Sequence, residues 1–161
     1  MVIDVWFEAD SVSKAEESDP LVHANLLNIA GLTDLAIAEF DRAEKRLLEC
    51  LSIRSKHLGA NEEPMVNINS NIGLAYGCQN DYRNSIRYLQ KALDIVHSWD
   101  RPSPVKEVLV YTNMGKVHGV AGDFDASEDC LNIALQAAAS LNSVFWITAY
   151  DQDRYMQTVH S

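Results

Sequence analysis

The stretch 71-NIGLAYGCQNDYRNSIRYLQKALDI-95 decides the fold of this chain, because it reads as two amphipathic helices joined by a tight turn. Ile72 and Tyr76 share one face of the first helix, and Leu89 and Leu93 share one face of the second. Between the two helices, Asn80 tolerates a left-handed backbone and precedes an aspartate that can cap the next helix. One such helix pair cannot bury its own apolar face, so we expect further copies of it in the chain.

The copies recur with a fixed period of 42 residues. Five columns of similar residues keep this spacing over three copies without a gap, and a regular period of this size indicates an array of stacked helix pairs. The columns are Gly31, Gly73 and Gly115; Phe40, Tyr82 and Phe124; Ala43, Ser85 and Ser127; Leu47, Leu89 and Leu131; and Cys50, Ala92 and Ala134.

The residues of the second copy resemble the tetratricopeptide repeat (TPR) family. The resemblance rests on Gly73 and Tyr76, on the turn 80–82, and on Leu89 with the pair 92–93. The long period is similar to the 42-residue variant found in kinesin light chains, and the resemblance extends over about residues 20–140. It implies an all-α fold, a right-handed α-solenoid of stacked antiparallel helix pairs.

The repeats divide the chain into a single predicted TPR-like domain over residues 1–161. The first copy lacks Gly, Asn and Pro at residues 37–39, but we predict a break there because the columns stay in register. The expected segments are an N-terminal helix at 1–18, three repeats at 21–59, 64–99 and 104–141, and a separate capping helix at 143–160.

Composition narrows the function classes. The net charge of −10 argues against nucleic acid and anionic membranes as partners, and residues 1–20 are the most acidic part, with six carboxylates against Lys14. No apolar run reaches the length that crosses a bilayer, and the start of the chain has no basic leader. The three cysteines lie far apart, so we predict a cytoplasmic protein without a disulfide framework, a metal site or a cofactor.

In the TPR family, the first helix of each pair lines a concave groove that holds the ligand. A row of asparagines there could clamp the backbone of an extended peptide, since a carboxamide both donates and accepts hydrogen bonds. Two cations at the C-terminal end could receive a carboxylate. The resemblance therefore implies these groove positions: Asn25, Asn28, Asn67, Ser70, Asn71, Thr112, Asn113, Lys116 and Arg154.

Two polar residues occupy the column where the second copy has Tyr76, namely Asp34 and His118. A carboxylate in a packing layer needs a partner, and we expect Asp34 to accept a hydrogen bond from a neighbour such as Tyr76, or to be hydrated. An acid and a histidine in one groove could also perform acid–base catalysis, but no nucleophile motif or phosphate loop accompanies them, so the structural interpretation is preferred.

These observations leave three hypotheses for function. The first is a non-enzymatic scaffold that binds a peptide or partner domain in the concave groove. The second is a groove that closes around a small molecule, with catalysis by Asp34 or His118. The third is self-association into a homo-oligomer, because an array with an exposed end tends to stack on copies of itself.

Overall fold

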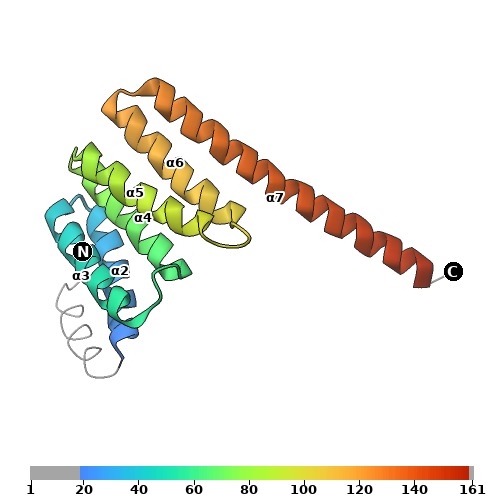
Figure 1. Ribbon diagram of the computed structural model, residues 1–161, viewed down its shortest axis with the longest axis horizontal. Coiled ribbons are helices and arrows are strands. Elements are labelled where there is room, and N and C mark those ends of the chain that lie inside the picture. The colour runs from blue at the N-terminus through green and yellow to red at the C-terminus, as the bar shows by residue number, and fades with distance from the viewer. Residues whose placement is uncertain (1–18, 160–161) are drawn as a thin grey trace, which may run out of the picture. The chain divides into compact units, whose positions relative to one another are not determined.

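The computed structural model describes residues 19–159, and the side chains of residues 19–141 (Figure 1). It divides into two compact units, Met1–Asp100 and Arg101–Ser161. The first unit contains α2 (Pro20–Ala36), α3 (Phe40–His57), α4 (Glu63–Cys78) and α5 (Tyr82–His97); the second contains α6 (Pro104–Ala121) and α7 (Phe124–Val159). No strand occurs between residues 19 and 159, so the predicted all-α class and the three helix pairs are confirmed.

Local sequence signals explain where the helices begin. The Asp19 carboxylate accepts a hydrogen bond from the Leu21 amide at 2.8 Å, and a proline opens the first turn of α2, α4 and α6. The Asp81 carboxylate caps α5 by accepting a hydrogen bond from the Asn84 amide at 3.1 Å. The bonds from Asn84 are also the main reason that the pKa of the Asp81 carboxyl lies below its usual value.

The turn inside each pair has the same backbone three times. In each copy a residue with positive φ ends the first helix: Ala38 at 61°, Asn80 at 62° and Gly122 at 85°. The next amide then donates to a carbonyl five residues earlier, from Glu39 to Asp34, Asp81 to Tyr76 and Asp123 to His118, at 2.9–3.0 Å. The predicted break at residues 37–39 is therefore confirmed, even though alanine pays a steric cost in this conformation.

The glycine column marks the closest approach within each pair. A Cβ atom added to Gly31, Gly73 or Gly115 would lie 2.7–2.8 Å from the Cγ atom of the leucine sixteen residues later. In the second and third copies, a serine hydroxyl (Ser85, Ser127) also donates to the glycine carbonyl, at 2.7 and 2.8 Å. These columns are thus packing residues, and they join the two helices of one pair.

The first unit stacks two pairs around one core. Figure 1 shows α3 beside α4, and the core includes Leu47 from α3 with Ile68 and Ile72 from α4, all of them fully buried. Each of these side chains contributes roughly 1.5–3 kcal/mol through its burial. At the edge of the unit, the Trp99 indole donates to the Asn61 carbonyl at 2.6 Å and so ties the end of α5 to the loop before α4.

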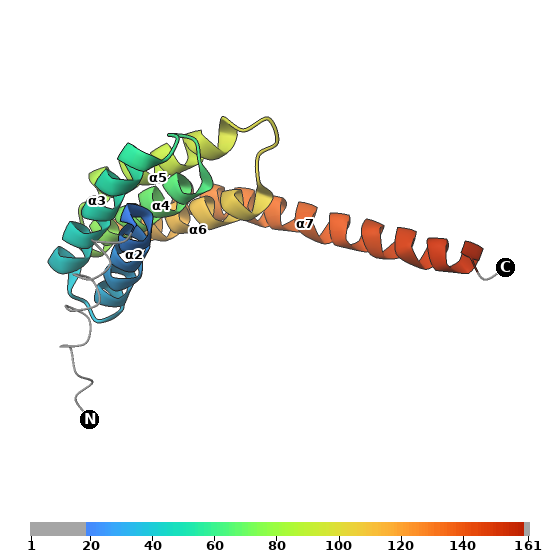
Figure 2. The ribbon, with the colours of Figure 1, turned by 90° about the horizontal axis from the view of Figure 1, so that it is seen from below.

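The separate capping helix predicted at residues 143–160 is wrong. Helix α7 continues through residues 141–143 without a break and has 36 residues, twice as many as its partner α6 (Figures 1 and 2). The reason is local: residues 137–143 contain neither Gly nor Pro, and three consecutive alanines favour continuation of the helix. The helix predicted at residues 1–18 lies outside the described residues.

Among residues 19–159, no helix is both long and apolar enough to cross a membrane.

Candidate functional site

Two of the predicted groove asparagines lie against each other in the first unit. The Asn71 side chain in α4 donates from Nδ2 to the Asn28 Oδ1 atom in α2 at 2.9 Å, and both side chains are half-buried. The bond uses one of the two Asn71 N–H donors, which leaves the second donor and the carbonyl oxygen available. The two first helices of neighbouring pairs therefore present a connected amide pair.

Exposed apolar side chains lie close to Asn28 along α2. Ile29 is 60% exposed and Leu32 is 39% exposed, and Leu32 lies one helical turn beyond Asn28. In α4, Leu74 lies about one turn beyond Asn71 and is half-buried. We call Asn28, Asn71, Ile29, Leu32 and Leu74 the amide surface; it combines hydrogen-bonding groups with apolar area, as a peptide-binding surface requires.

Asn25 has a structural role that the sequence did not reveal. Its Oδ1 atom accepts a hydrogen bond from Arg54 Nη2 at 2.9 Å, while Arg54 Nη1 donates to the Pro64 carbonyl at the same distance. Arg54 is only 6% exposed, so this guanidinium joins α2, α3 and the start of α4. The available signal was a departure from the repeat, because the other two copies have Val96 and an alanine in the Arg54 column.

The remaining predicted groove residues differ in how exposed they are. Ser70 and Asn113 are buried, which places them in the packing and not on an open surface. The side chain of Arg154 lies outside the described residues. Asn67 and Thr112 are half-buried and Lys116 is exposed; Thr112 and Lys116 belong to the second unit.

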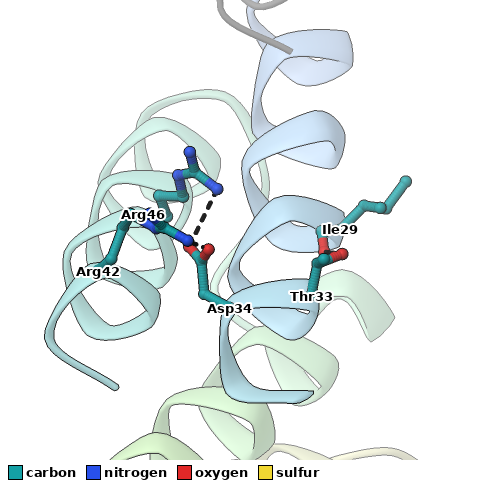
Figure 3. Close-up of polar contacts among 5 residues, drawn as sticks. All are labelled: Ile29, Thr33, Asp34, Arg42 and Arg46. Carbon is teal, nitrogen blue, oxygen red and sulfur yellow. Dashed lines mark hydrogen bonds and ion pairs between the residues drawn. The ribbon is translucent and has the colours of Figure 1, made fainter. Parts of the chain in front are cut away.

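Asp34 has a different partner from the one that we predicted. Its carboxylate is 2% exposed and accepts hydrogen bonds from Arg42 Nε at 2.8 Å and from Arg46 Nη1 at 2.9 Å (Figure 3). Both arginines come from the first half of α3, so the ion pairs close the turn from α2 to α3. The prediction that Asp34 accepts a hydrogen bond from a neighbour is confirmed, but the donors are these two arginines and not Tyr76.

Tyr76 instead belongs to the contact between α3, α4 and α5. Its ring stacks on Tyr88 with the centroids 5.6 Å apart. Burial, together with the hydrogen bond to the Glu44 carboxylate, raises the pKa of the Tyr76 phenol to about 12. Glu44 also accepts a hydrogen bond from Gln79 Nε2 at 2.8 Å. The carboxylate of Glu44 thus fills a structural role between α3 and α4.

His118, the second candidate for catalysis, lies at the turn of the second unit. Its Nδ1 atom is 3.4 Å from the Asp123 carboxylate, the residue that also opens α7. Both candidates are therefore engaged in contacts that hold a helix–helix turn. The described residues also contain no group of three or more His, Cys, Asp and Glu side chains that could hold a metal ion. The arrangement of Asp34 and His118 gives no support to the catalytic hypothesis.

The comparisons with known proteins agree with the repeated turn and the packing columns. Residues 70–97 match the family model of the tetratricopeptide repeat. The second copy is a tetratricopeptide repeat. Among solved structures, the chain is similar to BtubC (BKLC) from P. vanneervenii, with 24% identity, a TM-score of 0.67, and coverage of 74% of this chain and 48% of that one. It is also similar to MamA, with 15% identity, a TM-score of 0.58, and coverage of 87% of this chain and 74% of that one.

The chain thus spans about half the length of BtubC, and at these identities both similarities show the fold alone. No curated protein matches the sequence. The tetratricopeptide match falls on the second copy because this copy keeps the usual turn and cap residues, Asn80 and Asp81. In the first copy, Ala38 and Glu39 replace them, and Glu39 makes no side-chain cap bond.

Proposed function

We propose that this protein is a non-enzymatic scaffold whose amide surface binds an extended peptide segment of a partner protein. The family match and the fold support a protein-interaction role in general. The observation that carries the specific proposal is the half-buried Asn28–Asn71 pair, which lies beside exposed Ile29 and Leu32. We further propose a cytoplasmic setting, in which Cys50, Cys78 and Cys130 stay free.

In this proposal the amide surface recognises the backbone of the peptide more than its side chains. An extended peptide carries a donor and an acceptor at every residue, and the amide pair retains groups of both kinds. One apolar peptide side chain would cover Ile29 and Leu32, whose exposed area otherwise costs free energy in water. Each peptide–amide hydrogen bond contributes about 1 kcal/mol net, so two of them change the affinity by roughly tenfold or more.

The test begins with peptides selected from a random-peptide display library on the full chain. We expect the Asn28→Ala/Asn71→Ala double variant to bind such a peptide at least tenfold more weakly, measured by fluorescence polarisation. The control is Asn132→Ala, which removes an exposed asparagine of α7 and should leave the affinity unchanged. Methylation of backbone nitrogens in the peptide should weaken binding as strongly as loss of its apolar side chain.

Two outcomes would contradict the proposal. If the double variant is folded and keeps wild-type affinity, the peptide binds at a site other than the amide surface. Peptides that tolerate backbone methylation but no side-chain change would show recognition of sequence and not of backbone. In both cases the fold of the variant is checked by circular dichroism, since the Asn28–Asn71 bond also joins α2 to α4.

Self-association is a second candidate function, and the first half of α7 favours it. Leu131 and Leu135 are 39% and 67% exposed, whereas their counterparts Leu89 and Leu93 in the second copy are 0% and 4% exposed. Exposed apolar rows of this kind mark association surfaces. Sedimentation measurements over a hundredfold range of concentration test it: Leu135→Glu should keep the chain monomeric if α7 mediates the contact.

A further inference from the structure

Helix α5 carries a surface groove that the proposed peptide site does not use. The groove has a volume of about 480 Å³ and is lined by Arg83, Ile86, Arg87, Gln90, Lys91 and Asp94. Its lining holds three cations against one carboxylate, in a chain whose net charge is −10. A local surplus of positive charge on an acidic protein concentrates a field of one sign, which attracts an acidic ligand.

Two of the three cations are held in place by an aromatic ring. The Arg87 guanidinium carbon lies 5.3 Å from the centroid of the Tyr88 ring, and the Lys91 ammonium nitrogen lies 4.7 Å from it. Tyr88 is 8% exposed and its ring is stacked on Tyr76, so the position of the ring that the two cations contact is fixed by packing. Cations ordered before binding lose less conformational entropy when a ligand arrives.

The charges of the groove remain available for a ligand. In the part of the chain that the structure describes, Arg83, Arg87 and Lys91 form no ion pair. Two acids lie near them: Asp94 accepts a hydrogen bond from Gln90 at 2.8 Å, and Asp81 accepts one from Asn84. The charges of Arg83 and Arg87 also help to lower the pKa of Asp81, so these two arginines are partly compensated.

The packing of the repeats does not require these cations. The corresponding positions of the first copy are Asp41, Lys45 and Glu49, and those of the third copy are Asp125, Asp129 and Ile133. A column that packing dictates keeps its residue type, as the glycines and leucines do, whereas none of these three columns keeps a positive charge in all three copies. The stripe of three cations therefore belongs to α5 alone, and the packing of the repeats does not account for it.

We propose that the α5 groove binds an acidic amphipathic helix of a partner protein. Arg83, Arg87 and Lys91 follow one another at four-residue intervals, which is a spacing of about 6 Å along the helix. A partner helix that lies along α5 presents carboxylates at the same interval, so each faces one cation, and an apolar residue of the partner covers Ile86. This site is independent of the amide surface on α2 and α4.

The test uses a defined probe, a fluorescein-labelled helical peptide with glutamates at four-residue intervals and leucines on the adjoining face. We expect the full chain to bind it, and Arg87→Glu/Lys91→Glu to weaken the binding at least tenfold, because attraction is replaced by repulsion. The affinity should also fall as salt rises. The matched control is Lys45→Glu, since Lys45 occupies the Arg87 column in α3 and is exposed.

Four results would overturn the proposal. Equal weakening by Lys45→Glu would mean that net charge, and not the groove, attracts the peptide. Equal binding of a probe with lysines in place of the glutamates would exclude charge recognition. A wild-type chain that is oligomeric, and that Arg87→Glu converts to a monomer, would make a second copy of this chain the occupant. A loss caused by Asn28→Ala/Asn71→Ala would show that the two sites are one.

Discussion

Replacing Asp34 with alanine should destabilise the first unit by about 2–3 kcal/mol. The carboxylate is 2% exposed and accepts two charge-assisted hydrogen bonds, at 2.8 and 2.9 Å. Such bonds are each worth roughly 1.5–3 kcal/mol when they are buried. The side chains of Arg42 and Arg46 are 46% and 28% exposed, so water screens the pairs and rehydrates both cations after the substitution. The cost therefore stays below the roughly 3–5 kcal/mol of breaking a fully buried ion pair.

Thermal and urea unfolding, followed by far-ultraviolet circular dichroism, measure this change. For a chain of this length, each kcal/mol lowers the melting temperature by roughly 2–4 °C, so Asp34→Ala should lower it by about 5–10 °C. The control is Asp100→Ala, which removes an exposed carboxylate at the end of the first unit and should leave the melting temperature unchanged. The double-mutant cycle of Asp34→Ala with Arg46→Ala should give a coupling energy of about 1 kcal/mol or more.

A second variant separates the charge from the packing. Asp34 and Arg46 occupy the same columns as Tyr76 and Tyr88, which form a stacked ring pair in the next copy. The double variant Asp34→Tyr/Arg46→Tyr should therefore recover part of the stability that Asp34→Ala loses. The reasoning is refuted if Asp34→Ala melts at or above the wild-type temperature, or if the coupling energy is near zero.

Three further predictions follow from the turn, the tyrosine and the glycine column. Ala38→Gly should stabilise the chain by about 0.5–1 kcal/mol in urea unfolding because φ is positive there, whereas Ala139→Gly inside α7 should destabilise it by a similar amount. The Tyr76 phenol is neutral below pH 10 in both the folded and the unfolded chain, and between pH 10 and its folded pKa of about 12 it ionises only in the unfolded chain. The free energy of unfolding should therefore fall as pH rises over this range. Tyr76→Phe should make this fall smaller, as measured by the urea midpoints across the range. Gly73→Ala should cost about 1–3 kcal/mol in the same assay because its Cβ would lie 2.7 Å from Leu89 Cγ, and a wild-type midpoint would contradict the close approach.

The sequence alone determined the repeat and its packing columns. The 42-residue spacing holds because Gly31, Gly73 and Gly115 each face a leucine at van der Waals contact, and a larger residue would collide. The same spacing could also have located the left-handed turn residue of the first copy, since Ala38 lies 42 residues before Asn80. Short-range sequence signals were therefore sufficient to predict the helix pairs and their turns.

The tertiary structure decided which polar residues are available. Asn25, Asn28 and Asn71 look equivalent in the sequence, but Asn25 accepts a hydrogen bond from Arg54, a residue 29 positions away. The contact between Asn28 and Asn71 likewise spans 43 positions. Helix periodicity fixes the face on which a side chain lies, but not the partner that it meets on a neighbouring helix.

The ion pairs of Asp34 and the length of α7 show the same division. The sequence marked Asp34 as a carboxylate in a packing layer that needs a partner, which the structure supplies from α3 and not from Tyr76. Helix α7 continues because no helix breaker occurs near residue 141. The prediction missed this local signal because it ended the helix where the third repeat ends. Local backbone conformation depends on a few adjacent residues, whereas the partner of a buried charge is a residue distant in sequence that only the packing of the helices brings close.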